Sequence, residues 1–295
     1  MRIARYCFRG EQTYGVVNQS AILSLPDLAK RLGKEVPVTL KNFIKNRTGS
    51  LEIAEKLMNQ ACRKDMEDVS TPLSAVSLIA PIKSPPKIIC LGLNYFDHAA
   101  ETNSKVPDEP VIFMKPRTAI IGPNQKIIKP NFVKKLDYEG ELCIVMGKTA
   151  KNVTEADAKK HVFGYTVFND VSARGFQFKD GQWTRGKSFD TFAPTGPCIT
   201  TENQLKNTDN LTIRTWVNGE LRQNGTTRNM VLKVSQIVHH LSRVMTLEPC
   251  DIIATGTPAG VGHAMEPPQY LNDTDVVRIE IEGIGSLENS VEERA

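Results

Sequence analysis

The sequence predicts an α+β fold that is predominantly β, with a small α+β unit ahead of a larger β-rich domain. Three observations carry this prediction. Most apolar segments have the length of a strand, the dipeptide Asn218-Gly219 separates two of them, and one strongly amphipathic helix follows. Asn-Gly between strand-like segments is typical of a β-hairpin turn. We therefore expect a closed or sandwich-like β domain and not a doubly wound sheet of alternating strands and helices.

Residues 1–72 are expected to form the small N-terminal α+β domain. Strands are predicted over 3–8 and 13–17, and a helix is predicted where apolar residues recur at helical spacing, at Leu51, Ala54, Leu57, Met58 and Ala61. Residues 73–86 are expected to be a linker, because the prolines between 81 and 86 interrupt any continuous element. The β-rich domain then covers residues 87–295.

Within this larger domain the predicted strands are short and either apolar or alternating. They lie over 87–91, 111–114, 142–146, 163–169 and 277–281, and on both sides of the 218–219 turn. The amphipathic helix is predicted from one apolar stripe, formed by Val234, Ile237, Val238, Leu241 and Met245.

The composition narrows the class of protein. The chain has 295 residues, of which 40% are hydrophobic and 24% charged, as in ordinary globular proteins. A net charge of +4, evenly distributed, gives no indication of a nucleic-acid partner, and no apolar run is long enough for a membrane span. The six cysteines are widely spaced and the first residues are strand-like, so we expect reduced thiols and a cytoplasmic protein.

Residues 181–188 match the pattern of a phosphate-binding loop, G-x-x-x-x-G-K-S. Such a loop needs a helix that begins directly after it, because the first N–H groups of that helix bind the phosphate. Pro194 and Pro197 exclude a long helix at this position, and Trp183 and Arg185 are bulky where the backbone would surround a phosphate. We therefore expect no nucleotide here.

Acidic residues alternate in one segment, at Asp137, Glu139 and Glu141. In an extended chain these side chains share a face, with neighbours about 7 Å apart, and they repel one another unless water or a cation separates them. The segment continues into an apolar strand, so we expect an interior cleft; the alternative is a solvated edge strand. A further acid, Asp170, ends another apolar strand. Oxygen ligands alone indicate a hard divalent ion, Mg²⁺ or Mn²⁺, with Ca²⁺ as the alternative.

His98 and Glu101 lie at positions i and i+3 of a predicted helical turn over 96–101. A carboxylate beside an imidazole fixes its tautomer and raises its basicity, so the pair is suited to activating water. The alternative is an ordinary surface pair. The remaining histidines have no comparable partner in the sequence, and no role is assigned to them: His161, His239, His240 and His263.

Five ordered segments together resemble the fumarylacetoacetate hydrolase family, and the resemblance covers nearly all of residues 80–285. They are Leu93-Asn94-Tyr95 with His98 and Glu101, Asp137–Glu141, Asn169–Arg174, Gly186–Thr191 and Thr255–Gly262. The resemblance implies a catalytic domain of mixed β-sandwich or β-roll type over 87–295, an accessory N-terminal domain and a homodimer. It also implies a divalent cation, Mg²⁺ or Mn²⁺, and a small-molecule 2-oxo or 2,4-dioxo acid as substrate.

The resemblance also assigns roles to residues. It places the metal ligands at Glu139, Glu141 and Asp170, the catalytic groups at His98, Glu101 and Lys187, and substrate contacts at Gln177 and Thr257. In this scheme the cation polarises the 2-oxo group and stabilises the enolate, while Lys187 neutralises the remaining negative charge. The His98–Glu101 pair moves a proton, and Thr257 offers its hydroxyl and N–H to a carboxylate. Asp137 is expected to give structural support.

Three hypotheses about the function stay open. The first is hydrolysis of a C–C bond in an acylpyruvate- or fumarylacetoacetate-like acid. The second uses the same site for oxaloacetate tautomerisation or decarboxylation, or for isomerisation of a 2-hydroxymuconate-type acid. The third is a catalytically idle metal-binding protein, which the intact His98–Glu101 pair and Lys187 disfavour. Leu93 stands where several family members carry an arginine that holds a distal carboxylate, so the identity of the substrate stays open.

Overall fold

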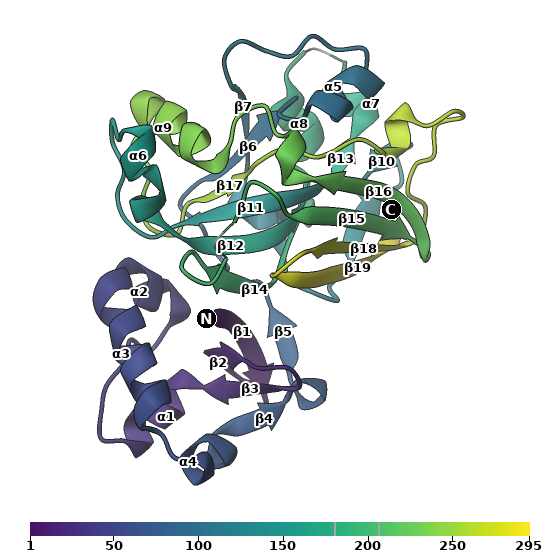
Figure 1. Cartoon of the computed structure of the whole chain (residues 1–295). Coiled ribbons are helices and arrows are strands. Elements are labelled where there is room, and N and C mark those ends of the chain that lie inside the picture. Colours follow the sequence, from purple (N-terminus) through teal and green to yellow (C-terminus); the bar gives the residue numbers. More distant parts are fainter. Residues whose placement is uncertain (180, 206) are drawn as a thin grey trace.

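A computed structural model describes residues 1–179, 181–205 and 207–295. The N-terminal elements, coloured purple to blue, lie below a larger part that contains the remaining elements (Figure 1). The strands of the described residues form a twelve-stranded, a five-stranded and a two-stranded sheet. The predicted α+β class with a predominance of β structure is confirmed. No helix of the described residues is long and apolar enough to cross a membrane.

The N-terminal part is a small sheet covered by helices. Its strands are β1 (Arg2–Phe8), β2 (Glu11–Val17), β3 (Ala21–Ser24), β4 (Ser70–Pro72) and β5 (Ser77–Ile79), and its helices are α1 (Leu25–Arg31), α2 (Leu40–Lys45), α3 (Arg47–Gln60) and α4 (Arg63–Asp68). The strands and the helix predicted here are confirmed. The helix α1 begins where the Ser24 hydroxyl accepts a hydrogen bond from the Asp27 N–H at 3.3 Å.

The sheet continues from the N-terminal part into the larger part. The strand β1 pairs with β5, which lies in the predicted linker, and also with β14 (Ala193–Thr201) of the larger part. All three predicted units thus contribute strands to one sheet: 1–72, 73–86 and 87–295. The division into these units stays a prediction.

The larger part is built on the other half of the twelve-stranded sheet, which runs from β14 to β7 at its edge. Its strands there are β6 (Ile88–Gly92), β7 (Val111–Lys115), β8 (Ile120–Ile121), β11 (Gly140–Met146), β12 (Val162–Asn169), β14 and β17 (Ile252–Ala254). Both β11 and β12 are buried along their whole length. One face of β11, with Leu142 and Ile144, packs in the core of the larger part, and the other face, with Cys143 and Val145, packs in a core shared with the N-terminal part. Burial on both faces explains why the segment is continuously apolar.

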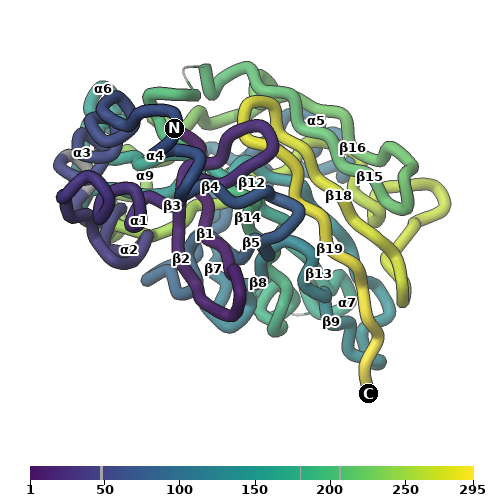
Figure 2. The backbone as a smooth tube through the Cα atoms, turned by 90° about the horizontal axis from the view of Figure 1, so that it is seen from below, coloured from purple at the N-terminus to yellow at the C-terminus, as the bar shows by residue number. Residues whose placement is uncertain are grey.

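The five-stranded sheet lies against this core. Its strands are β16 (Glu220–Thr226), β15 (Thr212–Val217), β18 (Val276–Ile281), β19 (Gly285–Arg294) and β9 (Ile127–Pro130), in that spatial order. Asn218 and Gly219 join β15 and β16 with φ values of 52° and 83°, so the predicted hairpin is confirmed. Figure 2 shows β18 and β19 side by side, with β19 leading to the C-terminus.

Short helices complete the larger part. They are α5 (Phe96–Glu101), α6 (Glu155–Ala158), α7 (Arg174–Gln177), α8 (Trp183–Lys187) and α9 (Val234–Val244), together with the 3₁₀ turns η2 (Arg117–Ala119), η3 (Lys159–His161), η4 (Thr227–Asn229) and η5 (Gly262–Ala264). The 3₁₀ turn η1 (Leu73–Ala75) lies in the N-terminal part, between β4 and β5. The predicted helices over 96–101 and from 234 are confirmed. After the loop at 181–188 no long helix begins, since α8 ends at Lys187 and β14 follows.

The extended acidic segment that is predicted to run into the strand over 142–146 is interrupted. The segment from Leu136 to Met146 divides into β10 (Leu136–Asp137), which pairs with β13 (Ser172–Ala173), and β11, which begins at Gly140. The expectation that Asp137, Glu139 and Glu141 lie on one face of a single strand is therefore wrong. The interruption lets Asp137 point to different partners from the other two acids.

Gly140 marks the closest approach of β11 to the five-stranded sheet. A Cβ atom there would lie 2.4 Å from Thr215 Oγ1 and 3.1 Å from Ile279 Cγ2. We predict that Gly140→Ala lowers the free energy of unfolding by about 1–3 kcal/mol, because the sheets must separate to accept the methyl group. Urea denaturation measures the effect. In Gly175→Ala, the control, the added Cβ meets no atom within 4 Å. Equal stability of the two variants would contradict the packing described here.

Candidate active site

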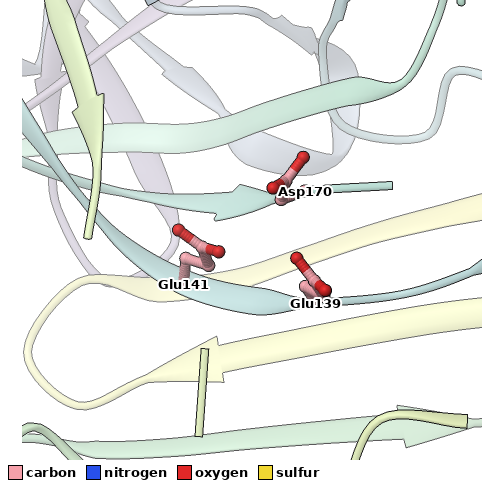
Figure 3. Close-up of side chains that lie close together, drawn as sticks. All are labelled: Glu139, Glu141 and Asp170. Atoms are coloured by element: carbon pink, nitrogen blue, oxygen red, sulfur yellow. The ribbon is translucent and has the colours of Figure 1, made fainter. Parts of the chain in front are cut away.

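Three buried carboxylates converge at the ends of two neighbouring strands. Glu139 precedes β11, Glu141 lies in β11, and Asp170 follows β12 directly (Figure 3). The antiparallel pairing of β11 with β12 sets Glu141 opposite Phe168. One oxygen atom of each of the three carboxylates lies within 4.8 Å of the others. The grouping that the sequence analysis expected for these residues is thus present in the structure.

Two lysines neutralise part of this cluster. Lys187 Nζ, at the end of α8, donates to Glu139 Oε2 at 2.7 Å and to Asp170 Oδ2 at 2.8 Å. Lys115 Nζ, at the end of β7, forms an ion pair with Asp170 and donates to the Val171 carbonyl at 3.0 Å. Both lysine side chains are buried. Asp170 therefore lies between two ammonium groups.

Asp137 and Arg174 form an adjacent ion pair. Arg174 Nη2 lies 2.8 Å from Asp137 Oδ2, and Arg174 Nη1 lies 2.7 Å from Glu139 Oε1. The Asp137 carboxylate also accepts hydrogen bonds from the backbone N–H groups of Gly262 and His263, at 2.9 and 3.0 Å. Asp137 thus connects Arg174 to a loop, which supports the structural role expected for it.

The pKa values of Glu139, Lys187 and Glu141 reflect how burial and neighbouring charges act on each group. Burial would raise the pKa of Glu139, but the charges of Lys187 and Arg174 outweigh it and hold that pKa below its ordinary value. Burial opposes the charge of Lys187, but Asp170 and Glu139 raise its pKa and keep it protonated. Burial raises the pKa of Glu141 well above its ordinary value, and the negative charges of Asp170 and Glu139 add to this effect. Lys187 pairs with Glu139 and Asp170, whereas no basic side chain among the described residues pairs with Glu141, so a divalent ion in the cluster would stabilise the charged form of Glu141.

The donor set fits a hard divalent cation. Carboxylate oxygens are the ligands that Mg²⁺, Mn²⁺ and Ca²⁺ prefer, and three of them converge here without a sulfur or nitrogen ligand. The central group comprises four acidic and three basic side chains: Asp137, Glu139, Glu141, Asp170, Lys115, Arg174 and Lys187. A divalent ion would change the formal charge of this group from −1 to +1. Counting only Glu139, Glu141, Asp170, Lys187 and the ion would give a formal charge of zero. The charge of the complete group with the ion is more positive, and it favours an anionic ligand.

A loop at residues 255–262 joins the acids of the site. Its backbone N–H groups donate to three different carboxylates: Gly256 to Glu141 at 2.8 Å, Gly260 to Glu101 at 2.7 Å and Gly262 to Asp137 at 2.9 Å. Gly260 has a φ of 107°, a conformation that glycine adopts without strain. The glycines of this segment therefore bring backbone donors to the site.

His98 and Glu101 form the pair that the sequence predicts. His98 Nδ1 lies 2.7 Å from Glu101 Oε1, on the same face of α5. Because the carboxylate accepts the hydrogen on Nδ1, the Nε2 atom is left as the basic nitrogen. The other oxygen of Glu101 accepts a hydrogen bond from the Gly260 N–H. The loop at 255–262 also donates to Glu141, so it connects the His98–Glu101 pair to the carboxylate cluster.

A cavity is lined by six of the eight predicted site residues, and the other two, Glu101 and Asp170, contact it only through His98 and Lys187. His98, Glu139, Glu141, Gln177, Lys187 and Thr257 all line it. Gln177 Oε1 accepts a hydrogen bond from Arg174 at 2.9 Å, so its amide NH₂ is the group it can offer to a ligand. The Thr257 hydroxyl donates to the Gly140 carbonyl at 3.0 Å and accepts from Gln223 at 2.7 Å. That hydroxyl is therefore committed to the protein, and the backbone N–H of Thr257 is the group left for a substrate.

Sequence reasoning did not assign three residues of the site. Arg174 lies in a family-like segment, but its partners Asp137 and Glu139 follow only from the fold. Lys115 ends an apolar strand, and a lysine in that context is a signal for a buried ion pair. His263 also lines the cavity, and its Nδ1 atom lies 2.8 Å from Tyr270 Oη, so it has a partner that the sequence did not reveal.

The fold carries a buried carboxylate cluster beside a histidine–glutamate pair, and a comparison with known families identifies the class of protein. The family model described as fumarylacetoacetate (FAA) hydrolase C-terminal matches residues 87–292. This chain belongs to the fumarylacetoacetate hydrolase family. Members of this family are hydrolases, isomerases and tautomerases that typically depend on a divalent metal, and the chain is an enzyme of this family.

Known proteins similar to this chain carry several activities in their names. It is 43% identical over 258 residues to a mitochondrial oxaloacetate tautomerase of Xenopus laevis, covering 87% of this chain and 79% of that protein. The solved fumarylacetoacetate hydrolase of Exiguobacterium antarcticum is 38% identical, with a TM-score of 0.84 and full coverage of both chains. A 5-carboxymethyl-2-hydroxymuconate delta-isomerase of Mycobacterium smegmatis is 35% identical, with a TM-score of 0.77 and full coverage of both chains.

The different partners of Asp137 and Asp170 give a direct test of their roles. We predict that Asp137→Asn lowers the free energy of unfolding by about 1–3 kcal/mol, because it weakens hydrogen bonds to a buried guanidinium, but leaves Mg²⁺ affinity close to that of the wild type. Asp170→Asn is expected to weaken Mg²⁺ binding at least about tenfold. Urea denaturation and calorimetry measure the two effects. Loss of Mg²⁺ affinity in Asp137→Asn alone would reverse the assignment.

Proposed function

We propose that this enzyme hydrolyses a C–C bond in a 2,4-dioxo or related 2-oxo acid, such as an acylpyruvate or a fumarylacetoacetate-like acid. The observation that carries the proposal is that one cavity is lined by Glu139 and Glu141 of the carboxylate cluster and by His98. A site of this kind has both a place for an anionic oxo-acid head group and a base for water.

The carboxylate cluster is proposed to hold the cation. Glu139, Glu141 and Asp170 would bind Mg²⁺ or Mn²⁺, and Ca²⁺ is accommodated by the same donors. The bound ion would act as a Lewis acid toward the 2-oxo group and favour negative charge on its oxygen. The Lys187 ammonium lies beside two of these carboxylates and adds positive charge where that negative charge develops.

His98 is proposed to move the proton. Its Nε2 atom accepts a proton from water, and the resulting hydroxide adds to the distal carbonyl carbon of the substrate. The C–C bond then breaks with its electron pair on the 2-oxo fragment, and the His98 imidazolium returns the proton to that carbon. Glu101 stabilises the imidazolium through the 2.7 Å contact with Nδ1. We place the Gln177 amide and the Thr257 N–H at the substrate, because both residues line the cavity.

The second candidate is tautomerisation of oxaloacetate. It is favoured by the name of the Xenopus laevis relative, which matches most of this chain. The chemistry needs the same residues, with His98 moving a proton between carbon and oxygen and no attack by water. The name of the Mycobacterium smegmatis neighbour extends the same reasoning to isomerisation of a hydroxymuconate-type diacid.

Two further proposals rest on the sequence. The wide spacing of the six cysteines supports reduced thiols and a cytoplasmic protein, and the resemblance to the family supports a homodimer. Light scattering coupled to gel filtration measures the oligomeric state directly.

The substrate panel is the experiment that separates these functions. Acylpyruvates, oxaloacetate and 2-hydroxymuconate-type dienes are assayed with Mg²⁺, with EDTA, and after EDTA is replaced by Mg²⁺. We expect Mg²⁺-dependent cleavage of an acylpyruvate that EDTA abolishes and Mg²⁺ restores. Faster keto–enol exchange of oxaloacetate without cleavage of acylpyruvates would establish the second candidate in its place. Turnover unaffected by EDTA would contradict the proposed site.

His98 can be tested separately from the metal. We predict that His98→Gln lowers kcat about 10²–10⁴-fold, because the proton acceptor is lost, while Mg²⁺ affinity is retained. Glu101→Gln, which keeps a hydrogen-bond acceptor at Nδ1 but removes its charge, is expected to lower kcat less. Steady-state kinetics and calorimetry on the same preparations give both values. A wild-type rate in His98→Gln would remove this residue from the mechanism.

A further inference from the structure

We propose that His263 determines substrate specificity by donating a hydrogen bond from Nε2–H to an oxygen atom on the distal half of the substrate. The inference rests on the proposed function, because it concerns the part of a 2-oxo acid that the carboxylate cluster does not bind. It assigns the enzyme to 2-oxo acids that carry a second oxygen function.

The His263 ring is fixed from several sides. The residue lies in η5 and lines the same cavity as Glu139 and Lys187. Its backbone N–H donates to Asp137 Oδ2 at 3.0 Å, and its ring centroid lies 5.2 Å from that of Phe178 and 6.1 Å from that of Tyr270. A side chain held in this way meets a ligand with little loss of conformational entropy.

One ring nitrogen is available to a ligand. Nδ1 lies 2.8 Å from Tyr270 Oη, and no group of the residues that the structure describes forms a hydrogen bond with Nε2. Burial lowers the pKa of His263, and the nearby Arg174 charge adds to the effect, so the ring is neutral near pH 7. Burial raises the pKa of Tyr270, so its phenol is protonated and is able to donate to Nδ1 or to accept from it. We assign the tautomer in which the phenol donates. The hydrogen of the neutral imidazole then lies on Nε2.

Several other polar groups that line the cavity already have partners in the protein, so the Nε2–H donor of His263 is important for binding a distal oxygen. Lys187 and Arg174 already pair with carboxylates of the cluster. The hydroxyl groups of Thr102 and Ser104 lie 3.1 Å apart and bond to each other. Much of the remaining lining is apolar, formed by Leu91, Leu93, Phe113, Phe178, Trp183 and Val261. A distal oxygen atom buried against such a surface loses its bonds to water, so a protein donor beside it discriminates strongly.

Three five-carbon acids with the same head group test the proposal. They are 2-oxovalerate, which has no distal oxygen, 2-oxoglutarate, which has a distal carboxylate, and 2,4-dioxopentanoate, which has a distal ketone. Their binding to the Mg²⁺-loaded protein is measured by calorimetry, and KM replaces Kd for any acid that is turned over. The acid that responds to His263 shows whether the recognised oxygen is charged or neutral.

The readout is the ratio of affinities within one protein. In His263→Phe, which keeps an aromatic ring but no donor, we expect at least one of the two acids with a distal oxygen to bind roughly tenfold more weakly relative to 2-oxovalerate. His263→Gln keeps an N–H donor and should recover most of that ratio. Because 2-oxovalerate is measured on the same sample, a partial loss of folded protein does not change the ratio.

Two failures can be told apart. An unchanged ratio for both acids in His263→Phe, with normal binding by the wild type, overturns the role of His263 and leaves the proposed function intact. Failure of all three acids to bind to the Mg²⁺-loaded wild type overturns the proposed function, and the role of His263 with it.

Discussion

Burying several carboxylates close together is the constraint on which the rest of this structure depends. Two like charges about 4 Å apart repel by on the order of 4 kcal/mol in a partly screened protein environment. One oxygen atom from each of Glu139, Glu141 and Asp170 lies within 4.8 Å of the other two. Each must therefore be neutralised, and the fold brings basic groups from three separate elements, β7, α7 and α8, to do so. Burial and the charges of Asp170 and Glu139 raise the pKa of Glu141, so a further cation beside it would stabilise its charged form.

The sheet arrangement follows from the same constraint. The pairing of β11 with β12 brings the acids together, and the close contact of Gly140 with the five-stranded sheet holds Glu139 and Glu141 in place. The loop at 255–262 then supplies backbone donors to Glu141, Glu101 and Asp137. One loop thus couples the carboxylate cluster to the His98–Glu101 pair. The N-terminal part packs on the opposite face of β11 and supports the sheet from there.

Much of the fold could be predicted from the sequence, because local patterns carry it. Apolar strands, the Asn218-Gly219 turn and the spacing of His98 and Glu101 depend on residues close in the chain. The acidic segment over 137–141 is predicted to be extended and continuous with the strand over 142–146, because alternation does not reveal the pairing of β10 with β13, which interrupts it. Lys115 lies 55 residues from Asp170, and no local pattern connects such partners. His263 was passed over for a similar reason, since only the folded loop brings its ring beside Tyr270 and into the cavity.

The central claim is that three carboxylates from two strands bind one divalent ion. Crystals soaked in Mn²⁺, with diffraction data collected at the manganese absorption edge, test it most directly, since the anomalous signal locates the ion independently of the protein atoms. The account predicts one strong anomalous peak within coordination distance of Glu139, Glu141 and Asp170. Saturating Mn²⁺ with no peak at these residues, and with Lys187 still bonded to both Glu139 and Asp170, would contradict it.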